Sequence, residues 1–144
     1  DSMPGAITRF CSRTGQREPE SQGEFVRVIL ESLALVYRHT LEILQEISGR
    51  KIGAINIIGG GSLNSLLNQF AADCTSLEVR AGPVEATAIG NLLAQAMAMG
   101  EIEDLQELRK IVRDSFPQQV YLPSRNPAWD VSYDRFCKLN SFHE

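Results

Sequence analysis

The residues best suited to chemistry lie in the run INIIGGGSLN, residues 55–64. Its first part is typical of a short buried strand, because β-branched residues bounded by glycine favour extended structure. The three glycines that follow allow another molecule to come close to the backbone. A helix that starts behind them would offer unpaired N–H groups and the positive end of its dipole. The run therefore predicts a cradle for a phosphate-bearing ligand.

Two enzyme motifs resemble this glycine run, and both fail at Asn64. A dinucleotide fingerprint, G-x-G-x-x-G, needs glycine at that position, and its acidic residue would be Glu78, inside a strand and not at its carboxyl end. A nucleophile elbow, G-x-S-x-G, would use Ser62 as nucleophile and also needs glycine at position 64. Asp130 and His143 follow Ser62 in the order such a triad requires, but the large sheet of that fold is not predicted.

Two interpretations of the run remain open from its spacing. One is a nucleotide-phosphate loop that supplies backbone N–H groups, since the G-K-[ST] ending of a P-loop is missing. The other is a plain strand-to-helix turn in which Asn64 or Ser62 caps the helix.

The composition narrows the class of protein. The chain has 144 residues, of which 43% are hydrophobic and 22% charged, so we expect an ordinary globular protein. The net charge is -4 and the basic residues are dispersed, which argues against a nucleic-acid partner or an anionic membrane surface. No apolar run reaches the roughly 20 residues of a membrane span.

The cysteine and histidine positions indicate a cytoplasmic protein without a metal site. Cys11, Cys74 and Cys137 are odd in number and widely spaced, which is typical of reduced thiols in the cytoplasm. Neither His39 nor His143 has a metal-ligand spacing to them.

The hydrophobic periodicity predicts an α/β chain rich in helices. Helices are expected over residues 1–14, 24–48, 64–75, 84–99, 102–115 and 127–139, strands over 54–58 and 77–81, and a short strand or extended tail over 119–122. The two strands flank one helix and should form a parallel βαβ unit with a right-handed crossover. On that helix we expect Leu66, Leu67, Phe70 and Ala71 to face inward.

Two parallel strands do not make a stable sheet, and a parallel sheet needs cover on both faces. The chain is therefore predicted to be the last part of a larger protein. We divide it into a helical segment (1–51), a glycine-loop βαβα unit (52–100) and C-terminal helices (101–144). Its wide apolar faces predict self-association of the isolated chain.

An ordered set of residues resembles the C-terminal nucleotide-binding domain of FGGY carbohydrate kinases. The set comprises Ile57 to Ser62, Asn64, Leu67, Gln69, Ala72, Asp73, Val79, the stretch Gly82-Pro83-Val84-Glu85-Ala86, and Ile89-Gly90-Asn91. Upstream residues, including Phe10-Cys11, Thr14-Gly15-Gln16 and Pro19-Glu20-Ser21, are similar to the rhamnulokinase branch of that family. The resemblance covers nearly the whole chain.

The resemblance implies the C-terminal part of an actin-like, ribonuclease-H-like ATPase domain, built with a second such domain around a cleft. It implies transfer of the γ-phosphoryl group of ATP, with Mg²⁺, to L-rhamnulose. By position, Gly60 would approach the phosphates, Gly59 and Gly61 would shape the loop, and Asn64 would contact the nucleoside. Glu85, Ala86 and Gly90 would belong to close helix packing beneath the site.

The family's catalytic aspartate, first phosphate loop and sugar-binding residues lie outside this chain. We therefore expect no catalytic residue here, no activity of the chain alone, and a partner in the missing N-terminal part of the kinase. Sugar would bind only to the full-length enzyme. The alternatives are another FGGY kinase, for xylulose, fuculose or glycerol, and a non-catalytic interaction module. Some rhamnulokinases have a cysteine near the position of Cys74 that could form a disulfide with it, but position 71 is alanine here, so we expect no such local bridge.

Overall fold

The computed structural model describes residues 2–140, which form six α-helices, one 3₁₀ turn and three short strands. In chain order these are α1 (Met3–Arg13), α2 (Gln22–Ser48), β1 (Ala54–Ile57), the 3₁₀ turn η1 (Gly59–Leu63), α3 (Ser65–Thr75), β2 (Glu78–Ala81), α4 (Ala86–Ala98), α5 (Leu105–Ser115), β3 (Gln119–Tyr121) and α6 (Ala128–Asn140). The predicted α/β class and the six predicted helices are confirmed.

The long helix α2 begins and ends at the residues its sequence predicts. The Ser21 hydroxyl accepts a hydrogen bond from the Glu24 N–H at 3.3 Å. The Glu24 carboxylate in turn accepts one from the Glu20 N–H at 2.7 Å, so two N–H groups of the helix entry are satisfied. Gly49 closes the helix in the left-handed region, at φ +64°.

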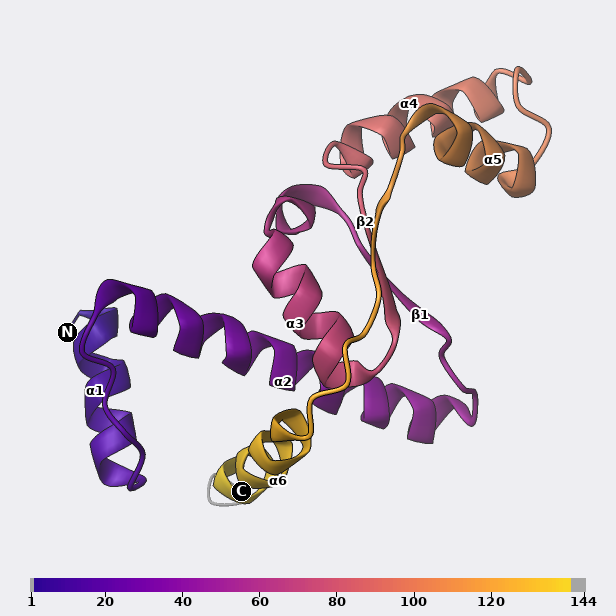
Figure 1. The fold of residues 1–144 in the computed structure, drawn as a ribbon. Helices are drawn as coiled ribbons and strands as arrows, with labels where there is room; N and C mark the ends of the chain where they lie inside the picture. Colours follow the sequence, from indigo (N-terminus) through magenta and orange to yellow (C-terminus); the bar gives the residue numbers. More distant parts are fainter. Residues whose placement is uncertain (1, 141–144) are drawn as a thin grey trace.

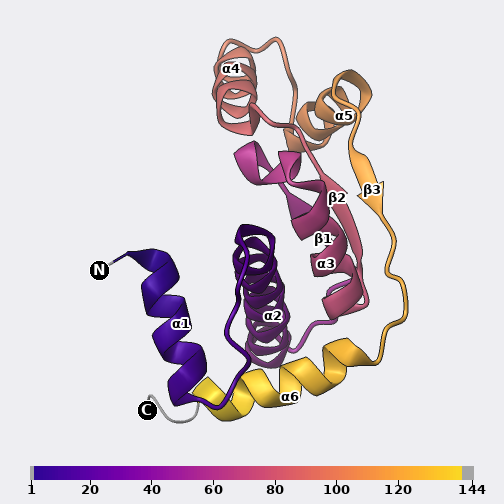
Figure 2. The same ribbon diagram turned by 60° about the vertical axis from the view of Figure 1, so that its left-hand side comes forward.

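The sheet has the strand order β1-β2-β3. β1 and β2 are parallel, with Ala54 opposite Glu78 and Ile57 opposite Ala81, so the predicted βαβ unit around α3 is confirmed. β3 pairs antiparallel with β2. The segment that the sequence left open between a strand and a tail is thus a strand, and it lies along β2 in Figures 1 and 2.

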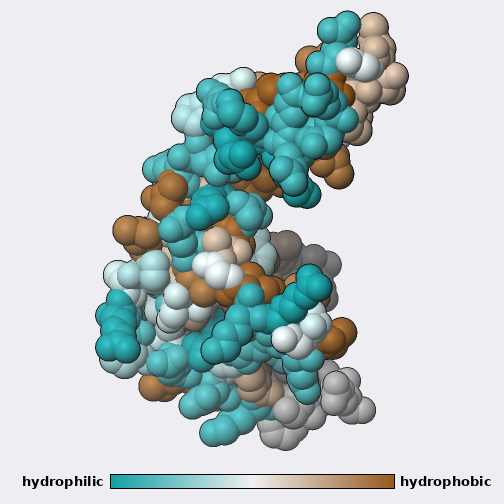
Figure 3. Space-filling view, turned by 90° about the vertical axis from the view of Figure 1, so that its right-hand side faces the viewer, coloured by the Kyte–Doolittle hydropathy of each residue, from teal (hydrophilic) through white to brown (hydrophobic). Residues whose placement is uncertain are grey.

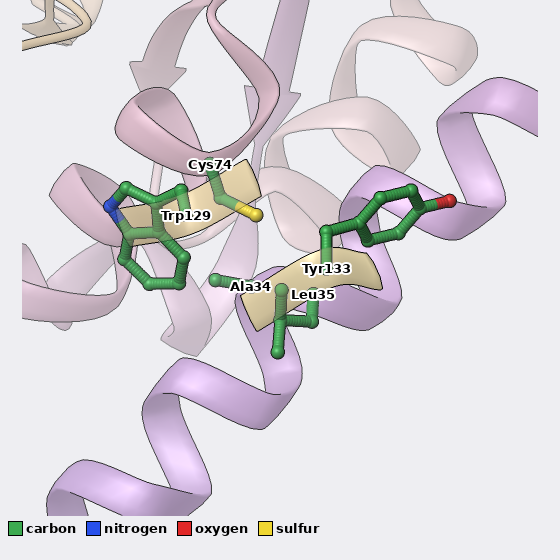
Figure 4. Packing of buried hydrophobic residues seen from close by; sticks show 5 residues of the cluster. All are labelled: Ala34, Leu35, Cys74, Trp129 and Tyr133. Carbon is green, nitrogen blue, oxygen red and sulfur yellow. The ribbon is translucent and has the colours of Figure 1, made fainter. Parts of the chain in front are cut away.

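The core has two clusters, one on each side of α3. Val79, Ala81 and Tyr121 of the sheet pack against Ala71 and Ala72 of α3. On the other side, α3 packs on α2 and α6, and Figure 4 shows the side chains that the three helices contribute: Ala34, Leu35, Cys74, Trp129 and Tyr133. The layers are therefore sheet, α3, then α2 with α6.

Two assignments on α3 differ from the sequence prediction. Leu67 and Ala71 are buried as expected, but Leu66 is 47% exposed, so its predicted inward position is wrong within this chain. Asn68 is instead fully buried. The apolar pattern selected Leu66 because it ranks leucine above asparagine, whereas the buried Asn68 side chain bonds to the Ser62 carbonyl of the glycine turn.

A polar cluster joins α2 to α6 beside the second core. Arg38 pairs with Asp130 at 2.8 Å and with Glu42 at 3.2 Å, and its guanidinium lies 4.2 Å from the centre of the Tyr133 ring. The Tyr133 hydroxyl donates to Glu42 at 2.6 Å. Burial, followed by the hydrogen bond to the Glu42 carboxylate, raises the pKa of Tyr133 above its usual value. Burial also raises the pKa of the Cys74 thiol to about 11.

Helices α4 and α5 stand away from the rest of the molecule, beyond the carboxyl ends of β1 and β2 (Figure 1). Figure 3 shows a hollow on one face between this end and the remainder. α4 has no buried residue, and a Cβ atom at Gly90 would meet nothing within 4 Å. The close packing expected around Ala86 and Gly90 is thus not made by the described residues, which leave the space around Gly90 open.

Candidate functional site

The glycine turn and the Gly82-Pro83 turn meet at the carboxyl ends of the two parallel strands. The Gly59 N–H donates to the Pro83 carbonyl at 3.1 Å, and the Gly82 N–H donates to the Ile57 carbonyl at 2.8 Å. These bonds continue the β1-β2 pairing past the last strand residues and hold both turns side by side. In open α/β sheets, ligands bind in the crevice outside the carboxyl ends of the strands.

The three glycines of the turn differ in whether the fold of this chain requires glycine at their position. Gly59 is in the left-handed region, at φ +73°, where residues with a Cβ atom are strained. At Gly61 a Cβ atom would be 3.6 Å from Ile57 Cγ2, an ordinary contact. At Gly60 a Cβ atom would meet nothing within 4 Å, and φ is not positive. The fold of this chain therefore requires glycine at position 59 and leaves open space at position 60.

Side chains from α3 and from the turn itself hold the carbonyl groups of η1. The Ser62 hydroxyl donates to the Gly59 carbonyl at 2.7 Å. The side-chain amide of Asn68 donates to the Ser62 carbonyl at 2.9 Å. Ser62 is 8% exposed and Asn68 is fully buried, so both bonds are largely screened from water. The bond from Asn68 was not predicted, because the sequence marks this residue only as a polar one between Leu67 and Gln69, on the helix that follows the glycines.

Asn64 is the N-cap of α3. Its side-chain oxygen accepts from the Leu67 N–H at 3.0 Å, and its own N–H donates to the Gly61 carbonyl at 3.2 Å. The sequence allowed either Asn64 or Ser62 to cap this helix, and in the structure the cap is Asn64. The contact of Asn64 with a nucleoside stays a prediction; the residue is exposed.

The structure assigns other partners to the groups of the two rejected motifs. The Ser62 hydroxyl is buried and committed to the Gly59 carbonyl, so it is not an exposed nucleophile. Asp130 pairs with Arg38 on the far side of α3, and His143 lies outside the described residues. Glu78 pairs with Arg80 at 2.6 Å.

The arrangement can present backbone N–H groups to an anion. Within η1, the first N–H groups have no intrahelical acceptor, as at the start of any helix. The Gly59 N–H donates to the Pro83 carbonyl, whereas the space beside the Gly60 backbone, where a Cβ atom would lie, is open. Across residues 2–140, no group of three or more His, Cys, Asp or Glu side chains is placed to hold a metal ion. No helix among the same residues is long and apolar enough to cross a membrane.

An α/β unit with a glycine turn at the carboxyl edge of parallel strands is an arrangement found in phosphate- and nucleotide-binding proteins. Residues 1–99 match the C-terminal domain of the FGGY family of carbohydrate kinases. The chain belongs to this family, as the ordered set of residues around the glycine run predicts.

Curated relatives agree with the predicted branch of the family. The chain is 48% identical over 134 residues to a rhamnulokinase of Bacteroides thetaiotaomicron, a match that covers 93% of this chain and 28% of that protein. It is 42% identical over 144 residues to a rhamnulokinase of Bacillus subtilis, which covers 100% of this chain and 28% of the relative. The chain thus spans less than a third of the length of these relatives.

A solved structure supports the fold. The chain superposes on the crystal structure of xylulose kinase from Rhodospirillum rubrum with a TM-score of 0.69 and 24% identity, over 89% of this chain and 26% of that one. The expected fold, the C-terminal part of an actin-like ATPase domain, agrees with this likeness.

Proposed function

We propose that this chain is one wall of the ATP site of a sugar kinase that transfers the γ-phosphoryl group of ATP to L-rhamnulose and forms L-rhamnulose 1-phosphate. Family membership and the identities of 42% and 48% to two rhamnulokinases support the reaction class and the sugar. The observation that carries the site is the open space at Gly60, at the carboxyl edge of β1 and β2. Xylulose, fuculose or glycerol as substrate has weaker support, since the xylulose kinase shares only the fold.

The residues of the glycine turn fit a nucleotide phosphate. Gly60 lets the phosphates reach the backbone, Gly59 sets the path of the turn through its positive φ, and Gly61 continues it without a side chain. Asn64 caps α3 and leaves its amide nitrogen for the nucleoside. ATP supplies the phosphoryl group, and this chain contributes binding and orientation, which dominate catalysis of phosphoryl transfer.

Magnesium would arrive with the nucleotide. Mg²⁺ is usually held by one or two carboxylates together with substrate phosphates. The carboxylates and the catalytic base would come from the remainder of the kinase, so we expect no activity from this chain alone. Three free cysteines, of which Cys11 and Cys74 are buried, support a reducing compartment such as the cytoplasm.

Two surfaces support a partner in the remainder of the kinase chain. The outer edge of β1 has no neighbouring strand among the described residues. One side of α2 exposes large apolar side chains: Val26 (52%), Leu44 (51%) and Ile47 (80%). An open strand edge and an apolar helix face are both unfavourable in water and are normally covered. Relatives more than three times as long as this chain have ample length to cover them.

The test uses the full-length kinase that carries this chain. Gly60→Val places a branched side chain where the phosphates approach, and we expect the KM for ATP to rise at least tenfold. Gly53→Val is the matched control, because Gly53 is also exposed with nothing within 4 Å but precedes the opposite end of β1. Wild-type KM and kcat in Gly60→Val would refute the phosphate-loop assignment. If the full-length kinase phosphorylated xylulose or glycerol in preference to L-rhamnulose, the proposed sugar substrate would be wrong.

A non-catalytic interaction module is the alternative of another class. Its supporting observation is the capping role of Asn64, which explains that residue without a ligand. Calorimetric titration of the full-length protein with ADP separates the two, since an interaction module would give no binding heat.

A further inference from the structure

The Ser62 hydroxyl and the Asn68 amide form a chain of hydrogen bonds behind the glycine turn. Ser62 Oγ donates to the Gly59 carbonyl at 2.7 Å, and Asn68 Nδ2 donates to the Ser62 carbonyl at 2.9 Å. Both residues lie at least nine-tenths buried beneath a turn whose Gly60 backbone is exposed. Each bond fixes a backbone carbonyl, so each also fixes the peptide unit to which that carbonyl belongs.

In a trans peptide unit, the carbonyl of one residue and the N–H of the next point in opposite directions. The carbonyl of Gly59 and the N–H of Gly60 share one such unit, which is trans. Because Ser62 draws the Gly59 carbonyl inward, the Gly60 N–H is directed away from Ser62. The Ser62 carbonyl and the N–H of Leu63 are related in the same way, with Asn68 holding the carbonyl.

The inward carbonyls matter for an anion. A carbonyl oxygen carries negative partial charge and would repel a phosphate, whereas an N–H group attracts it. A glycine turn has many accessible conformations, and a free one would sample both orientations of the Gly59–Gly60 peptide. A hydroxyl fixed on the Gly59 carbonyl removes the repulsive orientation before any ligand arrives.

Asn68 is a poor choice for stability alone. Its side-chain oxygen is buried and has no hydrogen-bond partner among the described residues. A buried polar atom without a partner lowers the free energy of unfolding relative to an apolar residue of similar size. Among residues 2–140, the side-chain bond that Asn68 does make goes to the glycine turn, so its role is expected there.

We propose that Ser62 and Asn68 are positioning residues that pre-orient the peptide units of the glycine turn for a nucleotide phosphate. The inference rests on the proposed function and adds two residues to it. Neither residue touches the ligand in this account; Ser62 acts through the Gly59 carbonyl, and Asn68 acts through Ser62.

The experiment measures ADP affinity in the full-length kinase with four variants. Ser62→Ala and Asn68→Leu each remove one donor, and we expect the Kd for ADP to rise about three- to tenfold, the range of one net hydrogen bond. Ser62→Thr keeps the hydroxyl and should restore the Kd. Thr75→Ala is the matched control, since Thr75 also donates its hydroxyl to a carbonyl, that of Ala71, at 2.7 Å on α3 but away from the turn.

A positioning role and a structural role predict different results. With positioning, Ser62→Ala and Asn68→Leu raise the Kd for ADP and the KM for ATP, leave the sugar KM unchanged, and melt no lower than Thr75→Ala. Wild-type ADP affinity in Ser62→Ala overturns the proposal, as does a lower melting temperature without a change in Kd. Gly60→Val distinguishes a failure of the positioning role from a failure of the proposed function. If Gly60→Val weakens ADP binding while Ser62→Ala does not, only the positioning role fails. If Gly60→Val also binds normally, the proposed function fails with it.

Discussion

Alanine substitutions at Gly59 and Gly60 should separate the stability of the glycine turn from its use as a binding surface. At Gly59, φ is +73° and the nearest outside atom to a Cβ would be the Val84 carbonyl oxygen at 3.9 Å. Alanine therefore fits in space, and its penalty is torsional, roughly 1–2 kcal/mol of unfolding free energy. At Gly60 there is neither positive φ nor a neighbouring atom within 4 Å. Alanine there should be neutral, or stabilising by about 0.4–1 kcal/mol through the unfolded chain.

For nucleotide binding we expect the reverse: Gly60→Ala should weaken binding more than Gly59→Ala does. A methyl group at Gly60 stands in the ligand's approach and prevents a hydrogen bond from the backbone to a charged phosphate, a contact worth about 1.5–3 kcal/mol, or tenfold and more in Kd. At an ADP concentration of 100 times the wild-type Kd, bound nucleotide stabilises the wild type by about 2.7 kcal/mol. A tenfold weaker variant gains only about 1.4 kcal/mol at the same concentration.

Thermal melting of the full-length kinase with and without ADP measures both quantities. Gly59→Ala should melt below the wild type without ADP. Gly60→Ala should melt at or above the wild type without ADP and show about half of its ADP-induced stabilisation. If Gly60→Ala destabilises the protein as much as Gly59→Ala and keeps the full ADP effect, the division of roles between the two glycines is wrong.

Three further results are expected away from the glycine turn. Arg38→Met removes the ion pairs to Asp130 and Glu42 and the contact with the Tyr133 ring, and should lower the free energy of unfolding by about 1–2 kcal/mol in urea titrations. Lys110→Met, which removes only an exposed pair with Asp114, should change it little. Burial raises the pKa of Cys74 from 9.0 to about 11, so the folded state favours the neutral thiol: stability should be intact below pH 9 and fall between pH 9 and 11. Cys74→Ala should flatten that fall in pH-dependent melting curves, and an unchanged slope would contradict the assignment. The isolated chain should self-associate in sedimentation and bind a hydrophobic dye in fluorescence, because its apolar faces are uncovered. Ile47 is 80% exposed, and Ile47→Glu should weaken both self-association and dye binding. A monomeric wild-type chain that binds no dye would refute the prediction that these faces need cover.

Local signals predicted the elements, because each element is encoded within its own residues. The capping residues Ser21 and Glu24 marked the start of α2, and alternation of apolar residues marked β2. β3 was left undecided because three residues are too few for a period, and its pairing with β2 depends on partners about 40 positions away.

The site was predicted less completely than the fold. The glycine run and Asn64 were predicted as the site from their order, but the bond from Asn68 to the Ser62 carbonyl was not, because Asn68 was not among the residues predicted to face inward. Burial of a polar side chain is decided by what it meets in three dimensions, here the Ser62 carbonyl. The contact of Arg38 with Asp130, 92 positions away, is likewise invisible to any local pattern.

We expect nucleotide binding and contact with the rest of the kinase chain to depend on each other. The glycine turn is held from behind by α3, which in turn packs between the sheet and α2. The apolar side of α2 and the free edge of β1, which the described residues leave uncovered, are therefore one layer away from the phosphate site. Covering them stabilises α2 and β1, and with them the α3 helix that carries Asn64 and Asn68. We therefore expect the rest of the kinase chain, by covering α2 and β1, to stabilise the turn geometry that the bonds from Ser62 and Asn68 already set within this chain.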